Sequence, residues 1–101
     1  MSVFNGQKYL KDSIKSIIRQ TYSNFEFIII NDGSTDSTLE IINSFDDDRI
    51  QIINNQHNIG LTKSLNKGIK IANGEYIARM DADDLSRSSR LEKQVQFLDQ
   101  N

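Results

Sequence analysis

The sequence predicts an α/β protein, built on an open, mostly parallel, twisted sheet with helices on both faces. Two observations lead to this fold class. Short runs of apolar, mostly branched residues alternate along the chain with segments whose apolar residues recur every three or four positions. The 101 residues also contain no proline, repeat or low-complexity linker. Such alternation is typical of parallel strands joined by right-handed helical crossovers, so we expect a single domain over residues 1–101.

The start of the chain is predicted to hold the end of a strand and then a helix. Residues 1–4 (MSVF) are short for a strand, and the turn pair Asn5-Gly6 follows them, so we expect only the last part of a strand there. A helix is predicted over residues 8–20, because its apolar side chains recur at helical spacing. Those side chains are Leu10, Ile14, Ile17 and Ile18.

A buried strand and a capped helix are expected next. Residues 25–30 (FEFIII) are almost wholly apolar, which favours a buried strand. Residues 31–38 (NDGSTDST) combine Asp, Gly, Ser and Thr, the composition of a loop that caps a helix. The helix is predicted from the apolar residues Leu39, Ile41, Ile42 and Phe45.

The rest of the chain continues the alternation. Residues 50–53 (IQII) are predicted as a third strand, and a polar loop follows over residues 54–60. A helix is predicted over residues 61–72, ending near the cap pair Asn73-Gly74. Residues 75–80 (EYIARM) are predicted as a fourth strand. A closing amphipathic helix is expected from Leu91, Val95 and Leu98.

The ends of the strands predict where a ligand binds. If the strands lie in the common order 3-2-1-4, winding reverses between strands one and four, and ligands of open α/β sheets bind at the carboxyl ends beside such a reversal. Those ends are Phe4-Asn5 for strand one and Met80-Asp81 for strand four, while residues 31–34 (NDGS) end the neighbouring strand two. We therefore expect three polar segments to converge on one edge of the sheet.

Three aspartates, Asp81, Asp83 and Asp84, occupy four positions directly after the predicted fourth strand. Carboxylates two residues apart on such a turn can both approach a hard cation. Mg²⁺ or Mn²⁺ usually takes one or two protein carboxylates and completes its shell with water and ligand phosphates. The alternative is that Asp83 or Asp84 caps the closing helix while the others are solvated. The position of the cluster at a strand end favours a metal–diphosphate site.

Asp32 also has two interpretations. Its carboxylate can accept an N–H from the edge of a nucleobase, while Phe4 offers a ring for stacking. Alternatively, the segment is only a turn, in which Ser34 or Asp36 caps the next helix; both interpretations hold together if Asp36 caps and Asp32 binds. Neither G-x-G-x-x-G nor G-x-x-x-x-G-K-[ST] occurs, so phosphates here would need the metal.

Composition limits the partners. The formal net charge of −2 provides no bulk attraction to nucleic acid, so we expect no nucleic-acid partner. The absence of cysteine excludes disulfides and thiolate sites. No apolar run approaches the ~20 residues that span a bilayer, and no signal region follows Met1. We expect a cytoplasmic protein, either free or peripheral to the inner face of the membrane.

Several ordered segments resemble the nucleotide-binding half of family 2 glycosyltransferases, which have the GT-A fold. The matching segments are SVFNGQKYLKDSIKSIIRQTYSNFEFIIINDGSTDST, NIGLTKSLNKGI, NGEYIARMDADD and RLEKQVQFL. Together they cover essentially the whole chain. The resemblance implies an inverting, metal-dependent transfer of a sugar from a nucleoside diphosphate sugar to an acceptor, often in the synthesis of bacterial polysaccharide.

The resemblance also implies roles for five residues. Ser2 and Phe4 stand where the family lines the base pocket, and Asp32 stands where it hydrogen-bonds the base. Asp81 matches the first aspartate of the family's Asp-x-Asp motif, near the ribose and the metal. Asp83 matches the aspartate that ligates Mn²⁺ or Mg²⁺ directly. A carboxylate that accepts a base N–H is compatible with uridine and guanosine, and we favour a UDP-sugar as the donor.

Two parts of the family pattern are absent. Family members begin with a longer first strand, and they continue into an acceptor-binding half that supplies the general base. No residue here matches that base, so the catalytic residue is unknown. We therefore expect a donor-binding fragment that is not active alone, within an enzyme whose acceptor is a saccharide or a lipid-linked sugar.

The sequence is also compared with two other classes of protein, each of which would give the aspartates another role. One is a non-catalytic α/β module whose aspartates only cap and solvate, and which forms a homo-oligomer through an unpaired sheet edge. The other is a receiver-like phosphotransfer domain. That chemistry requires an acidic pair near the end of the first strand, where this chain has Phe4-Asn5, so it is disfavoured.

Overall fold

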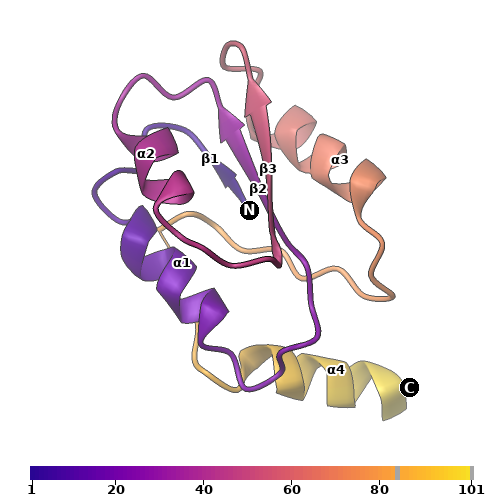
Figure 1. The fold of residues 1–101 in the computed structure, drawn as a ribbon. Coiled ribbons are helices and arrows are strands. Elements are labelled where there is room, and N and C mark those ends of the chain that lie inside the picture. Colours follow the sequence, from indigo (N-terminus) through magenta and orange to yellow (C-terminus); the bar gives the residue numbers. More distant parts are fainter. Residues whose placement is uncertain (84, 101) are drawn as a thin grey trace.

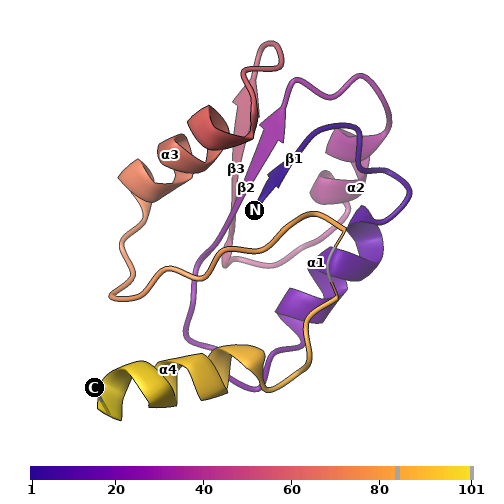
Figure 2. The same ribbon diagram turned by 180° about the vertical axis from the view of Figure 1, so that it is seen from behind.

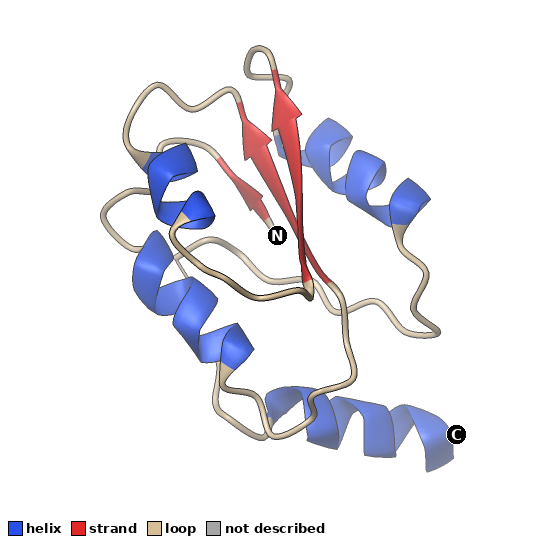
Figure 3. Ribbon diagram, in the orientation of Figure 1, coloured by secondary structure: helices blue, strands red, loops and turns tan. Residues whose placement is uncertain are grey.

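A three-stranded parallel sheet forms the centre of the protein. The computed structural model describes residues 1–83 and 85–100. For Gln100 it describes the backbone only. Its strands are β1 (Ser2–Val3), β2 (Phe27–Asp32) and β3 (Ile50–Asn55), with β2 in the middle and both pairings parallel (Figure 1). Strands and helices alternate over this part of the chain (Figure 3), which confirms the predicted α/β class.

The helices cover both faces of the sheet. α1 (Leu10–Ile18) and α2 (Thr38–Asn43) lie together on one face, and α3 (Leu61–Ile71) lies on the other, as the two opposite views show (Figures 1 and 2). α4 (Arg90–Gln100) lies beyond the last turn of α1. Within the described residues, none of these helices is both long and apolar enough to cross a membrane.

The alternating side chains of β2 divide the packing between the two faces, because neighbouring residues of a strand point in opposite directions. Phe27 and Ile29 enter the main core, where they meet apolar residues of β1 and of the two helices on that face. Ile28 and Ile30 face α3 instead, and Gly68 packs directly against both. The fully buried apolar residues are Leu10, Ile14, Ile29, Ile30, Ile42 and Val3.

The predicted fourth strand is wrong. Residues 75–80 form no strand, so the order 3-2-1-4 is reduced to the three strands β3-β2-β1 in the described part of the chain. A strand needs a partner that offers a continuous row of backbone groups. β1 has only two residues, and Ile77 is 60% exposed. Met80 anchors the segment through its side chain, which is buried in the main core.

Gln20 attaches α4 to the end of α1. Its Nε2 donates to the carbonyl oxygen of Arg87 at 2.7 Å, and its Oε1 accepts the N–H of Leu91 at 2.9 Å. The next residue, Thr21, donates its backbone N–H to Ser88 O at 2.7 Å and its hydroxyl to Glu92 at 2.7 Å. The predicted closing helix is therefore confirmed, and side-chain and backbone hydrogen bonds hold its first turn in place.

Gly33 allows the turn after β2 to touch the loop after β3. Its φ of +71° lies in the left-handed region that favours glycine. A Cβ at this position would stand 2.5 Å from the backbone nitrogen of Asn58 and 2.5 Å from the carbonyl carbon of His57. Residue 33 must therefore lack a side chain for the two loops to approach this closely.

We expect Gly33→Ala to lower the free energy of unfolding by about 3 kcal/mol or more, because backbone strain of about 1–3 kcal/mol adds to the steric clash. Gly74→Ala is a matched control, since a Cβ there would meet only Tyr76 O at 3.3 Å. We expect that control to cost less than about 1 kcal/mol. Urea unfolding of both variants measures the difference, and equal losses would contradict the proposed clash.

Candidate nucleotide-binding site

The loops that follow β1 and β2 are joined at the carboxyl edge of the sheet. Asn5 donates its backbone N–H to Ser34 Oγ at 2.9 Å, and its own Oδ1 accepts the N–H of Thr35 at 2.8 Å. Gly6 donates its N–H to Thr38 Oγ1 at 2.9 Å. Because each bond joins residues about thirty positions apart, the structure joins two of the three segments that were predicted to converge at the carboxyl edge.

Asp36 supports the start of α2, as its capping interpretation predicted. Its Oδ1 accepts the N–H of Thr38 at 2.9 Å, and its Oδ2 accepts the N–H of Gln7 at 3.3 Å. Burial opposes ionisation of Asp36, but these donors and the Thr38 hydroxyl hold its pKa below the ordinary value. Ser34 instead accepts a hydrogen bond from the loop after β1. Asp36 therefore caps α2, while Ser34 joins the two loops.

Ser2 and Phe4 lie on either side of the buried Val3. Ser2 is partly buried and pairs with Ile30 of β2. The side chain of Phe4 is 50% exposed at the end of β1. An exposed ring beside polar loops is suited to stack on a planar ligand. A role for both residues in a base pocket stays a prediction.

Asp32 ends β2 on the face that carries α3. Its Oδ1 accepts the amide of Asn55 at 2.9 Å and the backbone N–H of Ile59 at 2.8 Å. Its Oδ2 accepts the backbone N–H of Gly60 at 3.0 Å. Only 2% of Asp32 is exposed, and Ser64 adds a side-chain hydrogen bond. The carboxylate therefore holds together the ends of both long strands and the residues that lead into α3.

Hydrogen bonds keep Asp32 ionised despite its burial. Burial raises the pKa of a carboxyl group, but the donors Ile59, Asn55, Gly60 and Ser64 outweigh it and hold the pKa of Asp32 below its ordinary value. The negative charge lies at the amino-terminal end of α3, where the helix dipole also favours an anion. Asp32 thus has a structural role, and contact with a nucleobase stays a prediction.

Asp81 and Asp83 lie in a different part of the site. The carbonyl oxygen of Ala82, between them, accepts the hydroxyl of Ser13 in α1 at 2.6 Å. Both aspartates are exposed, and Asp81 has an ion pair with Arg79 at 3.4 Å. The contact with Ser13 places this segment against α1, and Asp81 also lies close enough to the Met1 amino group, at the start of β1, to stabilise its charge.

The two predicted halves of the site lie on opposite sides of β1. Asp32 belongs to β2, which pairs with one edge of β1, and its carboxylate faces α3. The segment that carries Asp81 and Asp83 passes near the beginning of β1 and then meets α1 (Figure 2). The Phe4 ring lies at the end of β1, between these halves. The structure thus joins the loops after β1 and β2, but it places Asp81 and Asp83 on the other side of β1, near its start.

The donor set suits a divalent cation that a ligand helps to bind. Among the described residues, no group of three or more His, Cys, Asp or Glu side chains is placed to hold a metal ion. Asp81 and Asp83 nevertheless offer exposed carboxylates two residues apart, and Mg²⁺ and Mn²⁺ accept one or two protein carboxylates when phosphates and water complete the shell. Asp84, the third aspartate of the predicted cluster, lies outside the described residues.

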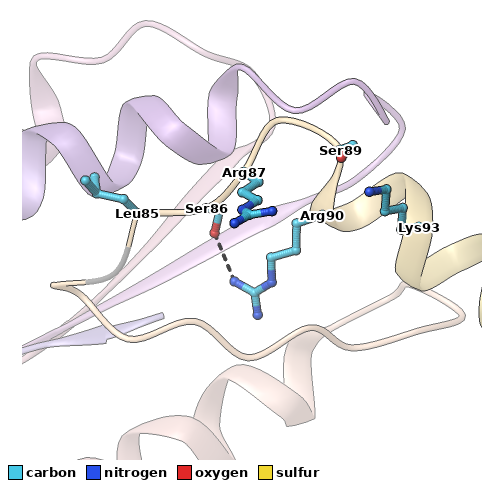
Figure 4. Close-up of a pocket in the computed structure, with 6 residues that line it drawn as sticks. All are labelled: Leu85, Ser86, Arg87, Ser89, Arg90 and Lys93. Carbon is cyan, nitrogen blue, oxygen red and sulfur yellow. Dashed lines mark hydrogen bonds between the residues drawn. The ribbon is translucent and has the colours of Figure 1, made fainter.

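An open recess of about 540 Å³ follows the aspartate segment, along the residues that lead into α4 (Figure 4). Within it Arg90 donates from Nη1 to Ser86 Oγ at 3.0 Å and from Nη2 to the carbonyl oxygen of Arg79 at 2.7 Å. Arg90 therefore holds the backbone of the aspartate segment at Arg79. The recess is lined by Leu85, Ser86, Arg87, Ser89, Arg90 and Lys93.

The fold and its carboxyl-edge site define a Rossmann-like α/β domain of the kind that binds nucleotides. The sequence model of glycosyl transferase family 2 matches residues 1–101, so the chain belongs to that family. An uncharacterized glycosyltransferase of Haemophilus influenzae is 49% identical over 97% of this chain and 31% of its own length. A further relative, the Escherichia coli UDP-Glc:alpha-D-GlcNAc-diphosphoundecaprenol beta-1,3-glucosyltransferase WfgD, is 33% identical over the whole chain and 40% of its own length.

Solved structures show the same architecture. The structure of residues 1–349 of Staphylococcus aureus TarS in complex with UDP-GlcNAc has a TM-score of 0.92 to this chain at 27% sequence identity. The similarity covers 98% of this chain and 30% of the TarS chain. The GT-A fold inferred from the motifs is thereby confirmed. The chain spans between 31% and 41% of the length of the first five curated relatives that it matches.

Sequence reasoning missed the residues that support Asp32. Asn55 was assigned to a loop, because the apolar run of the third strand stops at Ile53. The strand continues to Asn55 and presents that amide to Asp32. Ser64 and Lys67 follow Gly60 at helical spacing, but polar residues on a helix do not by themselves indicate a buried partner. A polar residue directly after a predicted strand was the one signal available.

We expect Asp32→Asn to lower the free energy of unfolding at pH 7 by about 2–3 kcal/mol, because it weakens hydrogen bonds to a buried charge. The pKa of Asp32 is lowered on folding, so its contribution is complete above the ordinary value of 3.8 and is lost as the pH falls below it. The Asp47 carboxylate, hydrogen-bonded and ion-paired with Arg49, has a pKa of about 2 and adds a loss in the same direction.

Urea unfolding between pH 7 and pH 3 measures this effect. The variant should show a flatter decline below pH 4 than the wild type, because only the contributions of Asp36 and Asp47 remain. Asp46→Asn, which changes an exposed acid, is the matched control and should follow the wild-type curve. Parallel curves for the wild type and Asp32→Asn would contradict the ionised state of Asp32.

Proposed function

We propose that this chain forms the donor-binding half of an inverting, metal-dependent glycosyltransferase that uses a UDP-sugar. The observation that carries the proposal is the likeness, over 98% of the chain, to a TarS structure that holds UDP-GlcNAc. Family membership over residues 1–101 supports the same class of reaction. The described geometry adds an exposed ring, a buried carboxylate and two exposed carboxylates around β1.

The base and ribose are proposed to lie over the end of β1. Phe4 would stack on the base, Ser2 would line the pocket, and Asp32 would accept an N–H from the edge of the base. The rigid loops after β1 and β2 support this arrangement, because their mutual hydrogen bonds hold the pocket wall before a ligand arrives. Asp81 is proposed to lie near the ribose and the metal.

The diphosphate is proposed to bind with Mn²⁺ or Mg²⁺ at Asp83, with Asp81 as the second carboxylate. When bound, the cation would neutralise charge that develops on the diphosphate leaving group. Ser13 holds the backbone between these aspartates through Ala82, which supports a fixed place for the segment beside α1. Arg79 competes for the Asp81 carboxylate through an exposed ion pair, which a ligand-bound cation of higher charge would displace.

In an inverting transfer, an acceptor hydroxyl attacks the anomeric carbon from the face opposite the diphosphate. The new bond to oxygen forms as the bond between the sugar and the phosphate oxygen breaks, and a general base takes the hydroxyl proton. No described residue here is placed in that role. We therefore propose that the chain binds the donor, while catalysis depends on a base that the described residues do not supply.

The acceptor is proposed to be a saccharide or a lipid-linked sugar used in bacterial polysaccharide synthesis. The named acceptor of WfgD, a GlcNAc-diphosphoundecaprenol, supports the lipid-linked class. Such an acceptor would place the enzyme in the cytoplasm at the inner face of the membrane. Self-association is proposed to use an edge of the sheet at β1 or β3, since each of these strands pairs with one other strand in the described part of the chain.

Calorimetric titration of UDP with and without Mn²⁺ tests this function. We expect the wild type to bind UDP more tightly when Mn²⁺ is present. Asp83→Ala should remove most of that gain, at least about tenfold in affinity, because the metal loses its direct carboxylate ligand. Binding of UDP without the metal should change little in the variant.

Asp48→Ala is the matched control, since Asp48 is an exposed aspartate in the loop before β3. It should leave both titrations unchanged. If the wild type binds no UDP under either condition, the donor-site proposal is wrong. If Mn²⁺ strengthens UDP binding equally in Asp83→Ala, the metal lies elsewhere.

A further inference from the structure

A second recess, of about 400 Å³, lies beside the one that leads into α4. Both recesses are lined by Leu85 and Ser86, and the backbone N–H of Ser86 donates to Ser16 Oγ of α1 at 3.1 Å. The recesses are therefore two parts of one surface, which we call the basic surface. It consists of Leu85 and of five basic side chains, which are Lys15, Arg19, Arg87, Arg90 and Lys93.

The charge of the basic surface differs from that of the whole chain. One acidic residue, Asp12, lines the two recesses together with the five basic ones. The chain as a whole has a formal net charge of −2, so its positive charge is concentrated here. Neither of the two ion pairs among the described residues includes a cation of the basic surface. Arg90 donates to uncharged oxygens of Ser86 and Arg79, which leave its positive charge in place.

Acidic residues flank the basic surface along the chain without neutralising it. Asp81 and Asp83 precede it, and Glu92 lies in the first turn of α4. Asp81 is already paired with Arg79, and Asp83 is the proposed ligand of the divalent cation. Among the described residues, Asp12 and Glu92 then remain against the five cations. The basic surface therefore carries an excess of positive charge that favours an anionic partner.

Leu85 lies where the two recesses meet, and 71% of it is exposed. No large apolar side chain in the described part of the chain is more exposed. Such a side chain gains nothing from a dissolved anion. At a membrane it can enter the boundary between headgroups and acyl chains, while nearby Lys and Arg side chains meet anionic headgroups. The combination of Leu85 with unpaired cations therefore fits a lipid surface better than a soluble phosphate.

We propose that the basic surface docks the protein on an anionic membrane, with Leu85 inserted among the lipids. The inference rests on the proposed function in one respect, because a lipid-linked acceptor makes lipid the expected source of the negative charge. It adds which part of the chain meets the membrane. Asp83 lies two positions before Leu85, so the basic surface adjoins the candidate metal segment. Docking there would bring a lipid-linked acceptor close to the bound diphosphate.

Co-sedimentation of the purified protein with vesicles tests this inference. We expect binding to vesicles of equimolar phosphatidylglycerol and phosphatidylcholine. Binding to phosphatidylcholine alone should be at least about tenfold weaker, because each basic side chain near an anionic surface contributes to the affinity. Salt at about 1 M shortens the Debye length to about 3 Å and should release the protein.

Arg87→Gln/Lys93→Gln removes two charges from the basic surface. Both side chains are exposed and make no hydrogen bond or ion pair within the described residues, so the fold should be kept. We expect this variant to bind the anionic vesicles at least about tenfold more weakly than the wild type. Lys63→Gln/Lys70→Gln is the matched control, because it removes the same charge from α3, on the opposite face of the sheet from α1 (Figures 1 and 2). It should bind within about twofold of the wild type.

Leu85→Ser tests insertion separately from charge. It should weaken binding to the anionic vesicles about threefold or more, because an apolar side chain no longer enters the lipid. Leu85→Ile keeps the apolar surface and should bind as the wild type does. Thermal unfolding of each variant shows that the proteins compared are folded.

Inorganic diphosphate distinguishes a lipid surface from a soluble phosphate. Calorimetric titration of the wild type with diphosphate, in the absence of Mn²⁺, should show no saturable binding. Saturable binding that Arg87→Gln/Lys93→Gln removes would assign the basic surface to a soluble phosphate and overturn the inference.

The remaining outcomes separate this inference from the donor-site proposal. Weaker vesicle binding in Arg87→Gln/Lys93→Gln and in Leu85→Ser, with none in the α3 control, supports the inference. Equal binding of the wild type and Arg87→Gln/Lys93→Gln, or no binding of the wild type to anionic vesicles, overturns it. Titration of UDP with Mn²⁺ on the same preparations tests the donor site by itself, because vesicle binding does not require UDP.

Discussion

The buried carboxylate of Asp32 is the constraint on which the rest of the structure depends. Negative charge in a nearly closed position is costly unless several donors surround it. Here the donors come from the end of β3, from the two residues before α3 and from α3 itself. The charge can remain only if those elements keep their places. One acidic side chain therefore sets the distance between the sheet and α3 at the edge where the site lies.

The two halves of the site differ in how firmly they are held. Around Asp32 the donors are backbone and side-chain groups that are already paired, and Gly33 brings the neighbouring loop into direct contact. Asp81 and Asp83 instead lie exposed on a segment without strand pairing, anchored by Met80 in the core and by the Ser13 contact to Ala82. This difference suits the proposed donor site. The base would bind against residues that are already fixed, while the diphosphate and its cation would order the segment of Asp81 and Asp83 on binding.

Periodicity predicted the elements whose packing is local. The stripe of Leu10, Ile14 and Ile17 has one explanation, a helix with one buried face, and α1 was predicted within two residues at each end. Residues 75–80 show why the rest could not be predicted. An apolar run has the composition of a strand, but a ladder also needs a neighbour, and the length of β1 is not visible from residues 75–80 themselves. The polar end of β3 could not be predicted for a related reason. Asn55 pairs with Asp32 of β2 and donates its amide to that carboxylate, and this partner is not visible from residues 50–55 themselves.

The sequence by itself determined the fold class, the order of the helices and the polar character of the carboxyl edge. It did so because apolar spacing and turn residues act over a few positions, and because several ordered motifs together are specific to one family. The tertiary structure alone decided which of those polar residues work together. Asp32 is joined to Asn55, Ser64 and Lys67 rather than to Asp83, because alternate residues of β2 face opposite sides of the sheet and Asp32 falls on the side of α3. These hydrogen bonds join residues up to 35 positions apart in the chain, so the spacing of neighbouring residues cannot predict them.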